Sequence, residues 1–491
     1  MTFNVSAYKE SLHAFPDVSY QEYQSIQDLD VRSDIAKRNK IVQTDAYNRT
    51  MTHIKGEDWR KEEVYGLSLR RSSAKEYVVI DGIRKQIQDI FSRPLGQAEL
   101  DFAAEYYADQ AAKGGNGYFN KAMWQEVLDK HNGYLPLTIR AVKDGTVLRP
   151  KEPALTVKGP AELAAVYEPL LLRIFLQSAV ATDTHVIDQI LGEGRVVEFG
   201  KRSAPTEQYH LDAMEGCLVG SSIKVTSNDT AALVYPQLRA GGTIAHRYLA
   251  SCTTEEEAFE KAILATDNMG LLIDLVDSYK GIDKAIALKK KYANTDKIIG
   301  MRLDSGDLAD QAIYALRNLE AEGMLDTRAK IVVADVSSVE QLVEIESRVT
   351  EAGFDPKKYL VYGLGGLLIA KNKTRDAVSA AFKLIKTEEG ATGKLSNDEA
   401  KRPISGYPNI EIRDHERVIV QEEEEVQGER LLDTVYDHGE LYFEGNDLDA
   451  IDQARARVKE TFPQVSRPTR KSEKTIKAEQ EALAKLLQTA A

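Results

Sequence analysis

Ile298-Ile-Gly-Met-Arg-Leu-Asp-Ser-Gly-Asp307 is the stretch of the chain that decides the fold. It begins as an apolar run, ends in a tight polar turn, and is followed by a helical pattern over residues 308–321. A strand that runs into a short polar loop and then a helix is the repeating unit of a parallel α/β sheet. The stretch therefore predicts one strand, loop and helix of such a sheet.

The same rhythm recurs on both sides of this stretch, between Arg195 and Gly366. Further strands are expected at 196–199, 222–225, 271–276, 330–334 and 359–362, with helices at 254–266 and 337–352. The second helix is expected to begin with Ser337 and Glu340 as a capping box. Short right-handed crossovers of this kind are expected to close the parallel sheet into a barrel.

The fold class predicted is α/β, with a (β/α) barrel-like domain of parallel strands and a mixed α+β domain built from N-terminal and C-terminal segments. Alternation of apolar and polar residues after Gly133 predicts short antiparallel strands before the barrel. The expected organisation is an arm at 1–40, a mixed α/β domain at 41–194, the barrel-like catalytic domain at 195–379, C-terminal strands at 380–462 that return to the first domain, and a polar helical tail at 463–491.

Composition excludes several classes of function. The net charge of −13 argues against a general nucleic-acid binder, which needs a basic face. No run reaches the roughly 18 apolar residues that cross a bilayer, and the first residues lack a secretory pattern, so a cytoplasmic protein without a membrane partner is expected. Cys217 and Cys252 have neither the number nor the spacing for a disulfide framework or a structural zinc site.

The turn after the quoted strand carries the strongest chemical signal. Arg302 can fork onto phosphate oxygens, Asp304 and Asp307 can take a metal ion or sugar hydroxyls, and Ser305-Gly306 offers backbone N–H groups to an anion. This pattern predicts a site for a magnesium–phosphate substrate. The alternative is a structural ion pair with Asp307 as a helix cap.

Two other strand ends carry residues suited to phosphate chemistry. Gly363, Gly365 and Gly366 allow a sharp turn whose N–H groups meet a phosphate, although glycine clusters also make plain turns. His246, at another strand end, has the chemistry of a nucleophile, an acid or a phosphate donor, although a lone histidine is more often structural.

Two more strand ends complete the predicted pocket. Asp277 is expected to face its mouth and to ligate a metal ion or orient His246, whereas Asp274 is expected within the strand. Phe199 and Arg202 offer an aromatic face and a cation, a pair that suits a flat, negatively charged heteroaromatic ring. Surface solvation is the alternative for Arg202.

In this order the motifs resemble those of the nicotinate phosphoribosyltransferase family and of its relative, nicotinamide phosphoribosyltransferase. The resemblance covers most of residues 41–440. It rests on Thr44-Asp-Ala-Tyr47, Glu198-Phe-Gly-Lys-Arg202, Gly242-Thr-Ile-Ala-His246, Arg302-Leu-Asp-Ser-Gly-Asp307 and Phe382-Lys-Leu384.

The resemblance implies an enzyme that joins nicotinate to 5-phosphoribosyl 1-pyrophosphate, giving nicotinate mononucleotide and pyrophosphate for NAD synthesis. It implies Mg²⁺ as cofactor and ATP as co-substrate, with His246 phosphorylated. It also implies a homodimer in which Tyr47 reaches the partner's site and stacks on the base opposite Phe199. Asp277 and Asp304 are expected to stabilise the ribosyl cation and to hold the metal ion through the pyrophosphate.

The complete predicted site follows. Catalytic residues are His246, Asp304 and Asp277; the base is bound by Tyr47, Asp45, Phe199, Arg202 and Asn228; the phosphoribosyl group is bound by Arg302, Ser305, Gly306, Asp307, Gly363, Gly365, Gly366 and Lys383.

The choice between acid and amide base depends on Asn228. Acid-using relatives carry Thr-Ser-Asn there, amide-using relatives an aspartate, and Asp229 lies next to it. Nicotinate is therefore expected, with nicotinamide as the alternative. Lys280 and Thr184-His185 depart from the family pattern. A non-catalytic phosphoribosyl-binding regulator remains an alternative. A Schiff-base aldolase ranks lower, because Lys224 is expected in mid-strand and the other candidate lysines are expected to be exposed.

Overall fold

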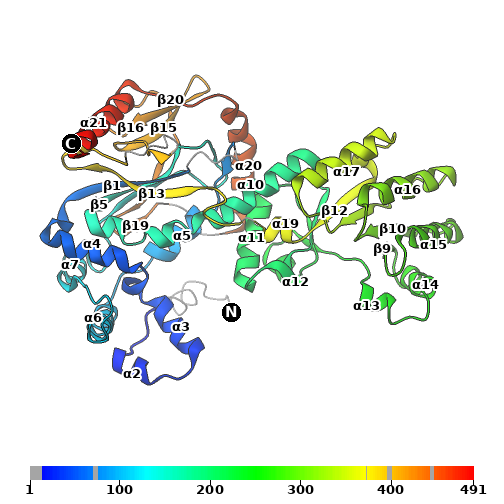
Figure 1. Ribbon diagram of the computed structural model, residues 1–491, viewed down its shortest axis with the longest axis horizontal. Coiled ribbons are helices and arrows are strands. Elements are labelled where there is room, and N and C mark those ends of the chain that lie inside the picture. The colour runs from blue at the N-terminus through cyan, green and yellow to red at the C-terminus, as the bar shows by residue number, and fades with distance from the viewer. Residues whose placement is uncertain (1–13, 70–75, 372, 395–400, 443–446, 491) are drawn as a thin grey trace, which may run out of the picture. The chain divides into compact units, whose positions relative to one another are not determined.

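The computed structural model describes residues 14–69, 76–371, 373–394, 401–442 and 447–490 (Figure 1). The chain folds into two compact units. Unit 1 combines Met1–Ala179 with Thr374–Ala491, and unit 2 is Val180–Lys373. The first 13 residues of the predicted arm and the last residue of the predicted tail lie outside the described residues.

Within the described residues, the strands of unit 2 form one seven-stranded parallel sheet in the order β8-β7-β6-β12-β11-β10-β9. The α/β fold class is confirmed. The described edge strands β8 and β9 do not pair with each other, so the sheet curls into a half-barrel rather than the closed barrel that was expected. The strands are β6 (Val196–Glu198), β7 (Val225–Thr226), β8 (Arg239–Ala240), β9 (Asn268–Leu272), β10 (Ile298–Leu303), β11 (Ile331–Ala334) and β12 (Leu360–Leu364).

Helices connect these strands, and Figure 1 shows α15, α16 and α17 beside them. Helix α16 covers the predicted residues, and Asp307 caps its N-terminus. Helix α17 is capped by Ser338, one residue after the expected Ser337, because the Ser338 hydroxyl accepts the Gln341 N–H. The helices are η3 (Lys201–Ser203), α11 (Glu207–Gly220), α12 (Asp229–Val234), α13 (His246–Leu249), α14 (Glu255–Ala265), α15 (Ser278–Lys291), α16 (Leu308–Ala321), α17 (Val339–Glu351), α18 (Pro356–Tyr359) and α19 (Gly366–Ile369), while α10 (Ile174–Leu191) spans the boundary of the units.

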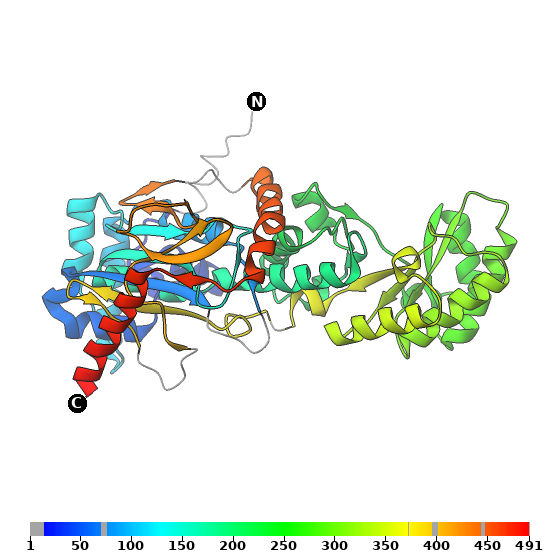
Figure 2. The same ribbon diagram turned by 90° about the horizontal axis from the view of Figure 1, so that it is seen from above.

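Unit 1 is built on antiparallel strands drawn from both ends of the chain. Its main sheet has the order β14-β13-β1-β5-β3-β18-β19, and smaller sheets have the orders β17-β15-β16-β20 and β2-β4. Figure 2 shows C-terminal yellow and orange segments among blue and cyan N-terminal ones. The strands are β1 (Glu62–Leu69), β2 (Val78–Val79), β3 (Thr138–Ala141), β4 (Val147–Leu148), β5 (Pro153–Pro160), β13 (Ala380–Thr387), β14 (Gly390–Ala391), β15 (Pro408–Arg413), β16 (Glu416–Gln421), β17 (Glu429–Arg430), β18 (Asp433–Asp437), β19 (Glu440–Leu441) and β20 (Arg470–Lys471).

The core of unit 1 explains this pairing. Leu67 of β1 lies opposite Leu155 of β5 and Phe382 of β13, and all three side chains are buried. A strand buried on its core face pairs only in the register that keeps its apolar residues inside. The helices are α2 (Tyr20–Ser25), α3 (Leu29–Arg38), η1 (Lys40–Val42), α4 (Ala46–Lys55), η2 (Gly56–Arg60), α5 (Ile83–Phe91), α6 (Gln97–Ala112), α7 (Lys121–His131), α8 (Ala161–Ala165), α9 (Glu168–Leu171), α20 (Leu448–Thr461), η5 (Phe462–Ser466) and α21 (Glu473–Ala490).

Among the described helices, none is by itself long and apolar enough to cross a bilayer. The segments Ala161–Leu171 and Ile174–Leu191, bent by 43° at the break between them, satisfy that test only as a pair and only by length and composition.

Candidate active site

A pocket of about 250 Å³ lies at the carboxyl ends of the parallel strands of unit 2. Its lining comes from the last residues of β10, β11 and β12 and from the segments that follow these strands and β6, the position where sheets of this kind place their ligands. The sequence predicted most of these residues but missed Ser203, which follows β6, and the run Ala334-Asp335-Val336 at the end of β11. The lining residues are Phe199, Arg202, Ser203, Arg302, Asp304, Ala334, Asp335, Val336, Gly363, Gly365 and Gly366.

Arg302 lines this pocket, and neighbouring side chains fix its guanidinium. Its Nη2 donates to Asp304 Oδ1 at 2.6 Å and its Nη1 donates to Thr243 Oγ1 at 3.2 Å. The guanidinium carbon lies 5.3 Å from the centre of the Phe199 ring, a cation–π distance. Its Nε is buried and has no hydrogen-bond partner among the described residues. Arg302 is therefore held in place while retaining donor capacity.

Glycines are required around Phe199 because the backbone approaches it closely. A Cβ added at Gly363 would lie 2.2 Å from Phe199 Cε2, and one at Gly365 would lie 3.1 Å from the Phe199 carbonyl oxygen. The Phe199 N–H donates to the Leu364 carbonyl at 2.8 Å. Gly363 thus makes room for the aromatic ring, a role beyond the turn that the sequence suggested.

His246 begins α13 and belongs to a cluster of polar side chains. Its Nε2 lies 3.0 Å from Asp274 Oδ1, and Ser305 Oγ donates to Asp274 Oδ2 at 2.6 Å. Ligand atoms of His246, Asp274 and Asp304 all lie within 4.8 Å of one another. Two carboxylates and an imidazole at this spacing can surround a divalent cation.

The carboxylate beside His246 belongs to Asp274. The sequence had suggested Asp277 for this position. Strand β9 ends at Leu272, so Asp274 lies in the loop after the strand and not within it. Asp277 instead caps α15, where its Oδ1 accepts the Lys280 N–H at 2.9 Å. The expected contact of Asp277 with His246 is therefore made by Asp274, which sequence reasoning passed over.

Asp307 caps the N-terminus of α16, which follows the pocket. This helix-capping role is the alternative that the sequence offered for Asp307. It accepts the Asp310 N–H at 2.9 Å and pairs with Arg348 at 3.1 Å. The hydrogen bond from Asp310, together with Arg348, lowers the pKa of the Asp307 carboxyl. Gly306 has a φ of +80°, which only glycine adopts without strain, so the turn that brings Ser305 to Asp274 requires it.

Two residues predicted to bind the base differ in exposure. Arg202 is exposed at the pocket, in a position to meet an anion. Asn228 is 3% exposed and caps α12, where its Oδ1 accepts the Ala231 N–H at 3.0 Å and its Nδ2 faces His210 Nδ1 at 3.4 Å. Both polar atoms of the Asn228 amide thus have partners inside unit 2, whereas the neighbouring Asp229 is exposed.

Asp45, Tyr47 and Lys383 belong to unit 1. Asp45 precedes α4 and is exposed, and Lys383 lies in β13 opposite Gly66. Tyr47 is 48% exposed, and its hydroxyl donates to Glu168 at 2.6 Å. Burial of its inner edge, followed by the hydrogen bond to Glu168, raises the pKa of Tyr47.

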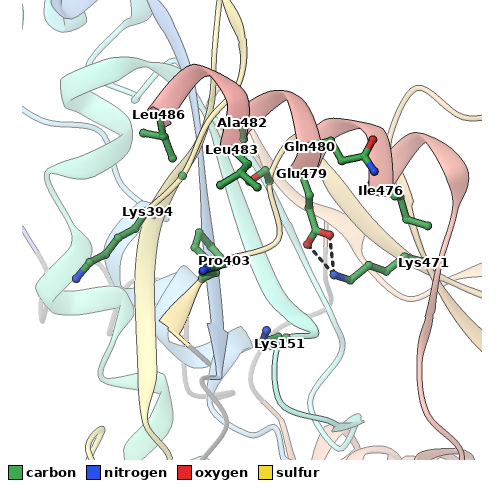
Figure 3. Close-up of a pocket in the computed structure, with 13 residues that line it drawn as sticks. Lys151, Lys394, Pro403, Lys471, Ile476, Glu479, Gln480, Ala482, Leu483 and Leu486 are labelled. Carbon is green, nitrogen blue, oxygen red and sulfur yellow. Dashed lines mark hydrogen bonds and ion pairs between the residues drawn. The ribbon is translucent and has the colours of Figure 1, made fainter. Parts of the chain in front are cut away.

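A second pocket, of about 310 Å³, lies in unit 1 beneath α21. Figure 3 shows Leu483 and Glu479 of α21 above it, with Glu479 held by Lys471 at 2.7 Å. The Lys394 side chain extends away from that ion pair. The lining of this second pocket, as far as the structure describes it, includes none of the predicted site residues.

Comparisons with known proteins find phosphoribosyltransferases similar to this chain. A family model described as the N-terminal domain of nicotinamide phosphoribosyltransferase matches residues 39–139. Nicotinate phosphoribosyltransferase of Bacillus subtilis is 28% identical over 276 residues, which are 55% of this chain and 54% of that protein. Nicotinamide phosphoribosyltransferase of Xanthomonas campestris is 23% identical over 64% of this chain and 74% of that protein.

Solved structures show the same fold. Human nicotinic acid phosphoribosyltransferase superimposes with a TM-score of 0.64 at 18% identity, over 90% of this chain and 99% of that one. The chain spans about half the length of the first relative named above. The chain is thus similar in sequence to nicotinate and nicotinamide phosphoribosyltransferases, and it shares the fold of the human nicotinic acid enzyme.

Proposed function

We propose that this protein is a phosphoribosyltransferase that joins nicotinate to 5-phosphoribosyl 1-pyrophosphate, releasing nicotinate mononucleotide and pyrophosphate for NAD synthesis. The observation that carries the proposal is the pocket of unit 2. It combines an aromatic face, Phe199, with the cations Arg302 and Arg202 at the ends of parallel strands. The names of several relatives give the same reaction.

In the proposed reaction the pyridine nitrogen of nicotinate forms a bond to C1 of the ribose while the bond from C1 to the pyrophosphate oxygen breaks. Both electrons of the broken bond leave with pyrophosphate. Positive charge develops at C1, and the carboxylate of Asp304, held by Arg302 at 2.6 Å, is the nearby group that stabilises it. Phe199 stacks on the pyridine ring, and Arg202 faces the nicotinate carboxylate.

Asp274 and Asp304 offer oxygen ligands close enough to hold Mg²⁺ with the pyrophosphate. A bound Mg²⁺ would neutralise charge on the leaving group. Asp274 replaces the originally expected Asp277 in this proposal, because Asp277 is engaged at the start of α15.

His246 is proposed as the residue that ATP phosphorylates. It is 49% exposed on its side chain, so a nucleotide can reach the ring, and Asp274 orients its Nε2 at 3.0 Å. A carboxylate beside one ring nitrogen strengthens the other as a nucleophile, because it stabilises the imidazolium that forms.

The working unit is proposed to be a homodimer in which Tyr47 stacks on the base of the partner's site. Tyr47, Met51 and Ile54 follow one face of α4, and they are 48%, 40% and 76% exposed. Apolar residues at this helical spacing are normally covered, and a second copy of the chain would cover them.

Nicotinamide is the second candidate base. The family model over residues 39–139 and the Xanthomonas relative both carry the name of the amide-using enzyme. We expect nicotinate to be preferred because Arg202 is an exposed cation at the pocket and suits a carboxylate.

The experiment supplies the purified protein with 5-phosphoribosyl 1-pyrophosphate, Mg²⁺ and either nicotinate, nicotinamide or quinolinate, and measures pyrophosphate release. Release with nicotinate above that with nicotinamide supports the proposal. Greater pyrophosphate release with nicotinamide would make nicotinamide the preferred base. No release with any of the three bases would reject the proposed function.

A further inference from the structure

A buried chain of polar side chains lies directly behind the loop that carries Phe199. Glu198, His210 and Thr226 are fully buried, and Asn228 is 3% exposed. They come from the end of β6, from α11, from β7 and from the start of α12. Four polar side chains from four elements, all without solvent, must satisfy one another.

The Glu198 carboxylate is the centre of this chain of polar side chains. Its Oε2 accepts the Thr226 hydroxyl at 2.5 Å, and its Oε1 lies 3.3 Å from His210 Nε2. The same Oε1 accepts the backbone N–H of Gly200. These partners replace the water that the buried carboxylate lost.

The bonds of Asn228 determine where the proton of His210 lies. Asn228 Oδ1 accepts the Ala231 N–H at 3.0 Å, so the other amide atom, Nδ2, is the one 3.4 Å from His210 Nδ1. Because Nδ2 has only donors, Nδ1 must accept and carries no proton. The proton is then on Nε2, from which it is donated to Glu198, and the ring is neutral.

This chain ends at the pocket. Glu198 immediately precedes Phe199, and the N–H of Gly200 that it accepts belongs to the next residue after Phe199. The Glu198 carbonyl also accepts the Ser227 N–H at 2.8 Å. The segment from 199 to 202, which gives Phe199 and Arg202 to the pocket, is therefore tied at its start to β7 and α11.

We propose that Glu198 and His210 are positioning residues, and that His210, donating from Nε2 to the Glu198 carboxylate, holds the 199–202 loop ready to bind the base. The kinetic part of this proposal rests on the proposed function. Apolar side chains would stabilise such an interior equally well, so a closed polar chain at this place indicates a requirement for one loop geometry.

The first experiment compares Thr226→Val, His210→Gln and His210→Asn with wild type. Valine keeps the shape of threonine but gives Glu198 no hydroxyl, so we expect KM for nicotinate to rise about 10-fold while kcat stays within about 3-fold. The His210→Gln amide stands where Nε2 stood and should keep KM within about 3-fold of wild type. His210→Asn, whose shorter amide stands nearer to Nδ1, should raise KM about 10-fold.

The matched control is Ser221→Ala. Ser221 is buried just after the C-terminal end of α11 and donates to the Cys217 carbonyl at 2.7 Å. Its replacement removes a buried hydroxyl that does not belong to the polar chain around Glu198. We expect its KM to equal that of wild type. Equal changes of KM in Thr226→Val and Ser221→Ala, or the same KM for His210→Gln and His210→Asn, would overturn the proposal.

The second experiment measures which ring nitrogen of His210 carries the proton, and it needs no assay of activity. In ¹⁵N-labelled wild type, the nitrogen shifts of His210 should show a proton on Nε2 and none on Nδ1. Asn228→Asp places a carboxylate against Nδ1 and should give a ring protonated at both nitrogens. A wild-type ring with a proton on Nδ1 contradicts the proposal. Because this measurement uses no substrate, it stands even if the protein makes no mononucleotide.

Discussion

At the scale of single residues, the pocket was predictable where the type of residue carries the chemistry. Phe199, Arg302 and Asp304 were identified because a ring, a guanidinium and a carboxylate follow apolar runs, and all three line the pocket. Asp274 was not identified, because the choice between it and Asp277 depends on where β9 ends, and that is at Leu272. Where β9 ends therefore decides which aspartate lies beside His246. Asp274 takes that position, whereas Asp277, three residues later, caps α15.

His246 and Asp274 give a direct residue-scale prediction. With radiolabelled ATP, wild type should form an acid-labile phosphohistidine and His246→Ala should form none. Asp274→Asn should label at least about 10-fold more slowly, because the amide no longer stabilises the charged ring. The measurement is label retained on the protein after base and acid treatment. Label that survives in His246→Ala assigns the phosphoryl group to another residue.

Gly363 gives a second prediction at the scale of single residues. The methyl of Gly363→Ala would enter the Phe199 ring at 2.2 Å, so the ring must move and the protein should lose about 1–3 kcal/mol of unfolding free energy. In Gly366→Ala the nearest atom to the methyl is Ser203 Oγ at 3.4 Å, an ordinary contact, so its stability should change little. Thermal unfolding followed by circular dichroism compares the two. Equal melting temperatures would show that the ring does not pack on Gly363.

At the scale of elements, long amphipathic segments were predicted better than short ones. The α16 prediction matches the observed Leu308–Ala321, because its apolar face repeats over several turns and Asp307 marks its start. The two-residue strand β8 was missed, since Arg239–Ala240 carries no periodicity. Closure of the sheet was expected from the rhythm of strands alone, but only hydrogen bonding between β8 and β9 would close it, and no sequence pattern encodes that bonding.

The cap of α16 predicts a dependence of stability on pH. Asp307 has a lowered pKa in the folded protein, so its carboxylate adds stability above its unfolded pKa of about 3.9 and loses it as the pH falls through the folded pKa. Asp307→Ala should destabilise by about 1 kcal/mol at pH 7, the usual loss of an N-cap. Urea unfolding of both proteins at pH 7 and at pH 3 should show the difference narrowing at the lower pH. A constant difference would assign the effect to something other than this carboxylate.

At the scale of the whole molecule, the pairing of β13 with β1 joins the N-terminal and C-terminal segments of the chain within unit 1. The alternation of apolar residues indicated strands at both ends, whereas the register, Leu67 opposite Phe382, depends on packing that only the folded core supplies. Whether a second chain covers the exposed face of α4 also lies beyond a single sequence.

That face predicts the state of assembly. Ile54→Glu puts a charge into the stripe of Tyr47, Met51 and Ile54, so a dimer held there should dissociate while each chain stays folded. Light scattering after size exclusion should give a mass near twice 54.6 kDa for wild type and near 54.6 kDa for the variant. Lys61→Glu, an exposed residue beyond η2, is the matched surface control and should remain a dimer. A monomeric wild type would remove Tyr47 from the proposed site.

The central claim is that the pocket around Arg302 in unit 2 carries out phosphoribosyl transfer. The most direct test measures nicotinate mononucleotide formed from nicotinate, 5-phosphoribosyl 1-pyrophosphate and Mg²⁺ by wild type and by Arg302→Gln. The account predicts product from wild type and a fall in kcat/KM of about 100-fold or more in the variant, because the guanidinium that holds Asp304 and faces the pocket is lost. Equal kcat/KM for the two proteins, or no mononucleotide from wild type, would contradict it.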